Sequence, residues 1–368
     1  MYLERLEVSS LRNLSGVQIE LSTGLNMMVG PNGSGKTALL EAVHILSRGR
    51  SFRTRNTSSV IQHDQDALVV RGVLQDEHRG RLSVGISKRT NNQTELKING
   101  ELEKRLSEVA GLLPIQLLLP NAADLLFSGP GVRRQFMDWG AFHVKPSYLP
   151  MLRDYQKVLK QRNALLRHTG HKNDRSELDS WTVRLVLLAE QVSVLRKEYL
   201  NALKGPFTAA LKALDEELNL HLGYHTGWRS GLAYEDALRE SSERDLALGS
   251  TQCGPHRADI KVTTDRGIYA ASELSRGQAK TVAHAMSLAQ AKLVESSVGR
   301  KSVFLIDDVG AELDVEHSER FFSLLSGLEC QVFATSTQKP ALLASFSGER
   351  QLTFHVEQGN CQVVDTET

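Results

Sequence analysis

The sequence is poor in the features that mark secreted, membrane-bound or zinc-stapled proteins. Its 368 residues include only three cysteines, Cys253, Cys330 and Cys361, which lie far apart and form no CxxC pair. They predict neither a disulfide framework nor a zinc site, and they fit a reducing cytoplasm. No apolar run approaches the roughly 20 residues that cross a bilayer, and the N-terminus is charged where a signal peptide is apolar. We therefore expect a cytoplasmic protein with no membrane partner.

Aromatic residues and net charge are also scarce. Aromatics make up 6% of the chain and the formal charge is only +1, so any basic surface must be local. Residues 151–204 hold eleven Lys and Arg against six Asp and Glu. This segment is a candidate phosphate-binding surface, with a merely solvated basic hairpin as the alternative. No strand interleaves basic and aromatic residues, so contacts to a nucleic-acid backbone are expected to dominate over base stacking.

Periodicity changes twice along the chain. Strand-like alternation dominates the first 110 residues and includes a turn signal at Asn99-Gly100. Helical spacing dominates from about 130 to about 222. The apolar positions from Trp181 to Tyr199 follow a 4-3 repeat that predicts a helix ended by Gly205-Pro206. A helix around residues 149–166 is expected to pack antiparallel to it, with residues 169–176 as the connecting tip. Strand-like sequence returns near Ile260.

A glycine-rich motif follows the short apolar segment at residues 25–29. It matches GxxxxGK[ST] and precedes a helix with Leu39, Leu40, Val43 and Leu46 on one face. Its backbone N–H groups and the helix dipole suit phosphate oxygens, Lys36 suits the β and γ phosphates of ATP, and Thr37 suits Mg²⁺. The predicted loop comprises Gly30, Pro31, Asn32, Gly33, Ser34, Gly35, Lys36 and Thr37.

Two carboxylates follow a second apolar segment near the other end of the chain. Residues 303–306 read as a buried parallel strand, and Asp307 and Asp308 come directly after it. We expect Asp307 to hold Mg²⁺ and Asp308 to polarise the water that attacks ATP. Because these motifs lie on either side of the helical middle, we predict an α/β head built from both ends of the chain. The expected segments are 1–125, an inserted helical lobe at 126–250, and 251–368.

Residues 274–278, Leu-Ser-Arg-Gly-Gln, resemble the LSGGQ signature of ABC-type ATPases. In that family the signature closes on the nucleotide of a second subunit, which implies an ATP-dependent homodimer and places Ser275, Gly277 and Gln278 at its ATP. Residues 311–314 resemble the D-loop of the same family, and Arg12 resembles a nucleotide-contacting residue of SMC-like heads.

Further stretches resemble the RecF branch of the SMC-like ABC-type ATPases. They are SLRNL (10–14), GRSFRT (49–54), RRQFMDW (133–139), KQRNALL (160–166) and GPHRAD (254–259). The resemblance implies an ABC/SMC-type head and an ATP-dependent protein of recombinational repair and replication-fork recovery. It also implies binding to gapped or junction DNA, and work with RecR and RecO in loading RecA onto SSB-coated single strands. The DNA-contact candidates are Arg50, Arg53, Arg55, Lys157, Lys160 and Arg162.

Departures from the wider ABC pattern predict a weak, DNA-stimulated ATPase that acts as a switch. The catalytic glutamate position holds Asp308, and residues 334–337, Ala-Thr-Ser-Thr, stand where a histidine is expected. Residues 119–125 leave the Q-loop metal ligand undefined, and His256 has no assigned role. Two alternatives stay open, an ATPase subunit of a transporter and the partner subunit of an SMC-like nuclease.

Overall fold

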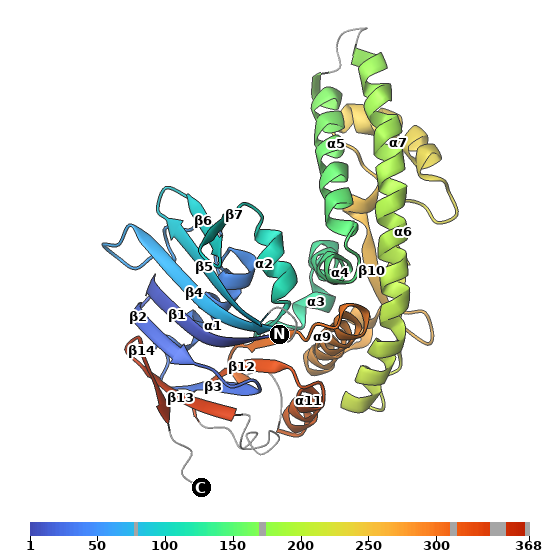
Figure 1. Ribbon diagram of the computed structural model, residues 1–368. Coiled ribbons are helices and arrows are strands. Elements are labelled where there is room, and N and C mark those ends of the chain that lie inside the picture. Colours follow the sequence, from blue (N-terminus) through green and yellow to red (C-terminus); the bar gives the residue numbers. More distant parts are fainter. Residues whose placement is uncertain (77–79, 169–173, 310–314, 339–350, 365–368) are drawn as a thin grey trace. The chain divides into compact units, whose positions relative to one another are not determined.

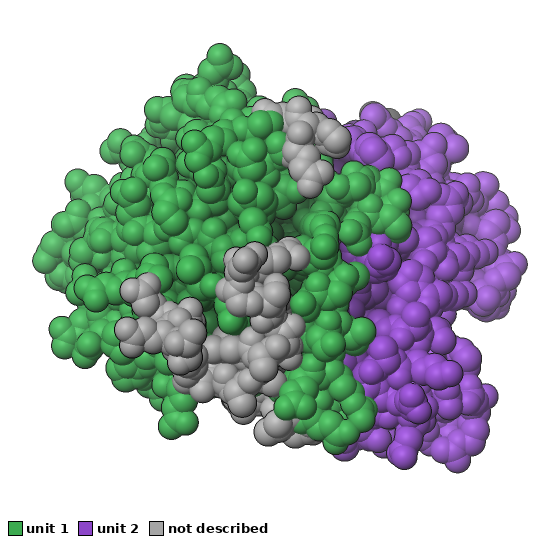
Figure 2. Space-filling model, turned by 60° about the horizontal axis from the view of Figure 1, so that its bottom comes forward, with its two compact units in different colours: residues 1–122, 294–368 green, residues 123–293 purple. Residues whose placement is uncertain are grey.

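The chain folds into two compact units (Figure 2). The computed structural model describes residues 1–76, 80–168, 174–309, 315–338 and 351–364. Unit 1 comprises residues 1–122 and 294–368, and unit 2 comprises residues 123–293. Both ends of the chain therefore fold into one unit. The sequence predicted this because the phosphate loop and the two acidic residues lie on either side of the helical middle. The contacts assign residues 251–293 to unit 2, whereas the three functional segments expected from the sequence remain a prediction.

The first sheet of unit 1 is antiparallel, with strand order β2-β1-β4-β5-β6-β7 (Figure 1). The turn predicted at Asn99-Gly100 is confirmed, because Ile98 pairs with Glu101 and both turn residues have positive φ angles, 51° and 84°. The strands are β1 (Tyr2–Leu11), β2 (Leu14–Glu20), β4 (Ala67–Asp76), β5 (Gly80–Arg89), β6 (Thr94–Ile98) and β7 (Glu101–Glu103).

The second sheet of unit 1 carries the nucleotide motifs. Its order is β14-β13-β3-β12-β11-β8, and β3 lies between β12 and β13, which come from the far end of the chain. All neighbouring pairs are parallel except β13 with β14. The strands are β3 (Leu25–Val29), β8 (Ile115–Leu118), β11 (Val303–Ile306), β12 (Gln331–Ser336), β13 (Gln351–Glu357) and β14 (Asn360–Val364). The buried parallel strand predicted at 303–306 is confirmed as β11.

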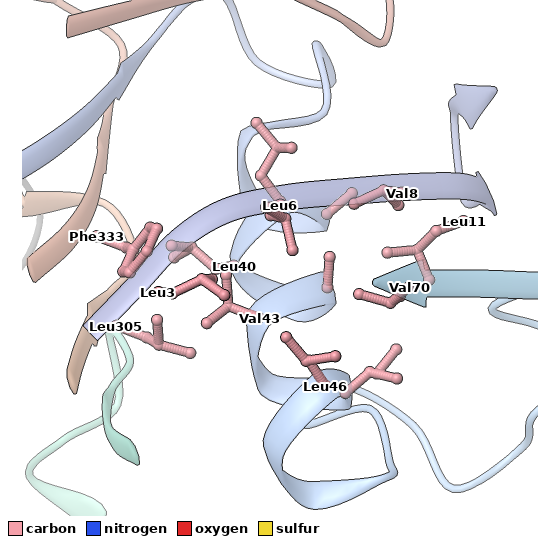
Figure 3. Close-up of a cluster of buried hydrophobic side chains, with 14 of the residues drawn as sticks. Leu3, Leu6, Val8, Leu11, Leu40, Val43, Leu46, Val70, Leu305 and Phe333 are labelled. Atoms are coloured by element: carbon pink, nitrogen blue, oxygen red, sulfur yellow. The ribbon is translucent and has the colours of Figure 1, made fainter. Parts of the chain in front are cut away.

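Helix α1 (Lys36–Arg48) fills the core of unit 1. The predicted apolar face is confirmed, since Leu39, Leu40, Val43 and Leu46 are all fully buried. Figure 3 shows side chains of α1 meeting those of β1, β4, β11 and β12. Burial of each such leucine contributes about 2 kcal/mol, so the core anchors the start of α1, where the phosphate loop ends. The unit also contains α2 (Leu106–Leu112) and α11 (Val315–Gly327).

Unit 2 is mainly helical. Its longest helices, α5 (Tyr148–His168) and α6 (Asp174–Leu214), run antiparallel, because Arg162 bonds Thr182 near one end and Arg196 bonds Tyr148 near the other. None of the described helices is long and apolar enough to span a membrane. The other elements are α3 (Asp124–Phe127), α4 (Pro130–Val144), β9 (Leu220–His225), α7 (Tyr234–Leu248), η1 (Pro255–Arg257), β10 (Asp259–Thr264), α8 (Ala270–Glu273) and α9 (Arg276–Val298). The last five residues of α9, 294–298, are assigned to unit 1.

Helix α6 corrects one sequence prediction. Gly205-Pro206 does not end the helix, which continues to Leu214 with Pro206 inside it. Proline lacks an N–H donor and disfavours a helix interior, but Phe207, Leu211 and Leu214 beyond it are almost fully buried. Their burial outweighs the local penalty. Strand β9 also falls inside the segment expected to be a helical lobe, and most of the expected tip, residues 169–173, lies outside the described residues.

Candidate nucleotide site

The predicted phosphate loop connects β3 to α1. Gly33 and Gly35 have φ angles of 79° and 118°, which favour glycine. Gly30 lies so close to β13 that a Cβ atom there would meet the Val356 carbonyl oxygen at 2.1 Å. The Asn13 amide donates to the carbonyl oxygens of Gly33 and Ser34 at 3.3 and 3.0 Å. These contacts fix the loop conformation.

Lys36 bends back over this loop. Its Nζ atom donates to the carbonyl oxygens of Gly30 and Pro31 at 2.7 and 2.8 Å. Burial lowers the pKa of Lys36, and the negative charges of Asp308 and Asp307 oppose that shift. Among the described residues no carboxylate is a direct hydrogen-bond partner of this ammonium group, so its charge can act on an anion at the loop.

The acidic residues after β11 reach the same loop. Asp307 Oδ1 accepts hydrogen bonds from Thr37 Oγ1 at 2.9 Å and from Thr335 Oγ1 at 2.8 Å. The Asp308 N–H donates to Thr335 Oγ1 at 2.8 Å, and Asp308 has a φ angle of 58°. Thr335 at the end of β12 therefore ties both acids together where a histidine was expected. Thr37 and Asp307, the two predicted Mg²⁺ ligands, are in direct contact although 270 residues separate them.

A cleft of about 300 Å³ lies over these residues. Eight predicted site residues line it: Arg12, Asn32, Gly33, Gly35, Lys36, Thr37, Asp307 and Asp308. Sequence reasoning missed Asn13, Pro120, Thr335 and Thr337, and it expected Arg53 to contact DNA, whereas Arg53 lines this cleft. Asn13 lies in the turn after β1, which packs beside the phosphate loop. No local sequence pattern predicts this tertiary contact.

The chemistry of the cleft fits a nucleotide with Mg²⁺. Arg12, Lys36 and Arg53 line the cleft and carry the positive charge that phosphate groups favour. Thr37 and Asp307 offer the hydroxyl and carboxylate oxygens that Mg²⁺ prefers.

The signature-like segment lies in unit 2 and includes the first residues of α9, which begins at Arg276. Ser275 and Gln278 form reciprocal bonds: the Ser275 N–H donates to Gln278 Oε1 at 3.0 Å, and the Gln278 N–H donates to Ser275 Oγ at 3.2 Å. This capping box starts the helix, and Ser275, Gly277 and Gln278 are all exposed. Their role at a second subunit's ATP remains a prediction. The predicted D-loop, residues 311–314, lies outside the described residues.

Comparison with known proteins identifies the family. Residues 2–360 match the family described as RecF/RecN/SMC N terminal domain. The DNA replication and repair protein RecF of Shewanella loihica is 37% identical over 365 residues, which cover 99% of this chain and 100% of that relative. The chain belongs to the RecF family of SMC-like ABC-type ATPases. RecF of a Marinomonas species is 42% identical over 338 residues, 92% of this chain and 91% of the relative.

A solved structure of a RecF protein also has this fold. It is described as the recombination mediator protein RecF-ATP in the RecFOR pathway, and it is 27% identical to this chain. The TM-score is 0.86, and the match covers 99% of this chain and 97% of that one. The predicted ABC/SMC-type head fold is thereby confirmed for this RecF-family chain.

Most of the predicted DNA contacts are exposed. Arg50, Arg53 and Arg55 follow α1, and Lys157 and Lys160 lie on α5. Exposure makes these side chains available to phosphate groups, but it does not distinguish a DNA surface from a solvated one. Their contact with DNA stays a prediction for this RecF-family chain.

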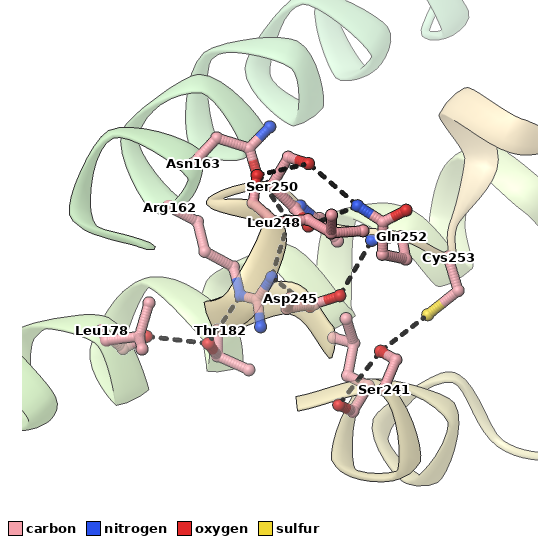
Figure 4. A network of polar contacts seen from close by, with 12 residues as sticks. Arg162, Asn163, Leu178, Thr182, Ser241, Asp245, Leu248, Ser250, Gln252 and Cys253 are labelled. Atoms are coloured by element: carbon pink, nitrogen blue, oxygen red, sulfur yellow. Dashed lines mark hydrogen bonds and ion pairs between the residues drawn. The ribbon is translucent and has the colours of Figure 1, made fainter. Parts of the chain in front are cut away.

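Arg162 is a correction to that set. Its side chain is only 4% exposed and forms an ion pair with fully buried Asp245 at 2.8 Å. It also donates to Thr182 at 3.0 Å and to Thr251 at 2.6 Å, so it lies at the centre of a polar network (Figure 4). Asn163 of the same helix accepts from the Thr251 N–H at 2.8 Å. A guanidinium held in this way is not available to DNA, and Arg162 joins α5 to the segment that follows α7.

His256, which the sequence left unexplained, is part of the same framework. The ring Nε2 lies 3.0 Å from the Thr251 carbonyl oxygen, and Nδ1 lies 2.6 Å from the Tyr155 hydroxyl. Since a carbonyl only accepts, Nε2 carries the proton and Nδ1 accepts from tyrosine. Burial lowers the pKa of His256 to about 4. The histidine is thus neutral and structural.

This geometry predicts a loss of stability in mild acid. Burial also lowers the pKa of His44 to about 4 from its ordinary value of 6.5. The folded state disfavours the protonated forms of His44 and His256. The contribution of each neutral histidine to the free energy of unfolding is therefore complete above pH 6.5 and is lost as the pH falls towards 4. Each amounts to about 3 kcal/mol. Denaturant titrations between pH 7.5 and 4.5 should show the decline, and His256→Gln should flatten it; an equal slope in that variant would contradict the assignment to His256.

Proposed function

We propose that this chain is an ATP-dependent DNA-binding protein of recombinational repair and replication-fork recovery, with slow ATP hydrolysis as its release step. The observation that carries the proposal is the contact of Thr37 with Asp307, within a cleft that also holds Lys36. Family membership supports the assignment to DNA replication and repair. Action in the cytoplasm is part of the same proposal.

The loop residues would bind and orient the triphosphate. Lys36 would exchange its bonds to two loop carbonyl oxygens for bonds to the β and γ phosphates. When Mg²⁺ is bound by Thr37 and Asp307, it supplies charge neutralisation and a fixed orientation for the phosphates. The contacts of Lys36 with the loop carbonyl oxygens and of Thr37 with Asp307 support these separate roles in phosphate binding and metal binding.

Asp308 would hold the attacking water. Its backbone N–H is anchored by Thr335, and its positive φ angle turns the residue out of the line of β11. An aspartate has one methylene fewer than the glutamate of the wider family, so its carboxylate reaches less far towards a water. We therefore propose slow hydrolysis that DNA stimulates and that times the release of DNA.

The signature segment supports a dimer as the active form. An exposed capping box at the start of α9 presents a hydroxyl and a helix N-terminus, which together suit the γ phosphate held by a second copy. Gapped or junction DNA is the proposed ligand of the dimer. RecR, RecO and RecA are proposed as partner proteins, with support from a relative placed in the RecFOR pathway.

The proposal is tested by Lys36→Arg and Ser275→Arg, with Lys212→Arg and Ser272→Arg as matched exposed controls. Sedimentation with ATP should show dimers for wild type and controls but monomers for both site variants. Binding to gapped, duplex and single-stranded DNA, measured with and without ATP, should lose its nucleotide dependence in the same two variants. The composite-site proposal fails if both variants dimerise with ATP and bind DNA as wild type does.

A further inference from the structure

One buried acid in unit 1 lies outside the predicted nucleotide motifs. Glu41 is on α1, five residues after Lys36, and its side chain is 0% exposed. A carboxylate is costly to bury unless it is paired and hydrogen-bonded. The role of Glu41 can therefore be inferred from its hydrogen-bond partners.

The first partner is Arg12, in the turn between β1 and β2. Arg12 Nε donates to Glu41 Oε2 and Nη2 donates to Oε1, both at 3.0 Å. Arg12 Nη1 also donates to the Ser59 carbonyl oxygen at 2.7 Å. A guanidinium has five N–H donors, so two have no partner among the described residues and are available to the cleft that Arg12 lines. Arg12 has a φ angle of 54°, a costly conformation that its surroundings must enforce.

The second partner is Ser51, in the segment after α1. Its hydroxyl donates to Glu41 Oε1, and its oxygen accepts the backbone N–H of Arg53 at 2.9 Å and that of Thr54 at 3.1 Å. Arg53 lines the same cleft as Arg12. One carboxylate thus holds one arginine of the cleft directly and the backbone of another through a hydroxyl.

We infer that Glu41 is a positioning residue that sets Arg12 and Arg53 over the phosphates of a bound nucleotide. The inference rests on the proposed function and deepens it. Glu41 itself does not line the cleft. It neutralises Arg12 and fixes its direction, so the two free N–H groups act as aimed donors. Because α1 begins in the phosphate loop, the same helix fixes the loop and both arginines relative to one another.

The test is a double-mutant cycle on Mg²⁺-ATP affinity, measured by calorimetry. Arg12→Ala should weaken binding roughly tenfold or more, the size of one charge-assisted hydrogen bond, and Glu41→Gln should weaken it several-fold. The double variant should lose less affinity than the sum of the two single losses, because one of the two arms of Glu41 acts through Arg12. In the same way Glu41→Gln with Arg53→Ala should lose less than the sum of its two single losses. Additive losses with both Arg12→Ala and Arg53→Ala would overturn the inference, since they would mean that Glu41 acts through neither arginine.

Asp245→Asn is the matched control, because Asp245 is also a fully buried acid paired with an arginine, but in unit 2. It should lower the melting temperature and leave Mg²⁺-ATP affinity unchanged; a loss of affinity equal to that of Glu41→Gln would count against a specific role. If Glu41→Gln does not fold, the cycle of Ser51→Ala with Arg53→Ala tests the second arm in the same way. If Lys36→Arg binds ATP as wild type does, the proposed function itself fails. If Lys36→Arg loses ATP binding but the affinity losses in the Glu41 cycles are additive, only the role of Glu41 fails.

Discussion

Asp308→Asn is expected to slow ATP hydrolysis by about 10²–10⁴-fold, the range for loss of a group that assists proton transfer. The amide cannot take up the proton of the attacking water, whereas the anchor from the Asp308 N–H to Thr335 is a backbone contact and is retained. Mg²⁺-ATP binding should change little. Single-turnover hydrolysis and calorimetry separate the two quantities, and ATP-dependent dimers of this variant should live longer than those of wild type.

Asp307→Asn is the matched control for that prediction. Asp307 contacts Thr37 and Thr335 through the same oxygen, so its amide variant should weaken Mg²⁺-dependent binding before it affects the chemical step. Unchanged single-turnover hydrolysis in Asp308→Asn would refute the assignment of Asp308 as the water-polarising group. Loss of binding in both variants to the same degree would place Asp308 with the metal ligands instead.

Arg162→Met is expected to destabilise the protein by about 3–5 kcal/mol, the usual effect of removing one partner from a buried ion pair. The substitution keeps most of the apolar stem but leaves Asp245 buried without its cation. The Gln252 N–H, which donates to Asp245 at 2.9 Å, compensates only in part. Denaturant unfolding at neutral pH measures the loss, and Arg162→Met with Asp245→Leu should recover much of it.

Lys160→Met separates this structural role from a DNA contact. Lys160 lies two residues from Arg162 on α5 but is exposed, so its substitution should change stability by less than about 0.5 kcal/mol. If Lys160 contacts a phosphate, the slope of log affinity against log salt should decrease by about one. The reverse pattern, a stable Arg162→Met with a smaller salt slope, would restore Arg162 as a DNA contact.

The sequence predicted those parts of the site that local chemistry determines. The phosphate loop needs glycines, a lysine and a hydroxyl at fixed spacing, and β11 needs an apolar run ended by acids; both are legible in a single segment. The predicted apolar face of α1 follows from helical periodicity in the same way. On α6 the 4-3 repeat predicted the helix but only part of its buried face, because Leu188 and Leu195 are half-buried.

Partners that come from distant segments were not predictable in this way. Arg162 looks like other basic residues of α5 until Asp245, 83 residues later, is placed beside it. Glu41 reads as an ordinary helical glutamate until the turn after β1 brings Arg12 to it. Pro206 predicts a helix end when only the local sequence is considered. The burial of Phe207 and Leu211, which keeps the helix going, arises only in the folded unit. In each case a tertiary contact outweighed the local signal.

The central position of β3 has a consequence for synthesis. Its two neighbours, β12 and β13, begin at residues 331 and 351, so the strand that leads into the phosphate loop gains both partners only after nearly the whole chain has left the ribosome. Unit 2 is complete by residue 293 and is able to fold earlier. The first sheet of unit 1 can pair once Glu103 has been synthesised, but during translation β3 and β8 remain unpaired until their partner strands are made. Nascent chains arrested before residue 330 should be bound by chaperones and should lack the nucleotide site. ATP binding is therefore expected only after β12 and β13 have been synthesised.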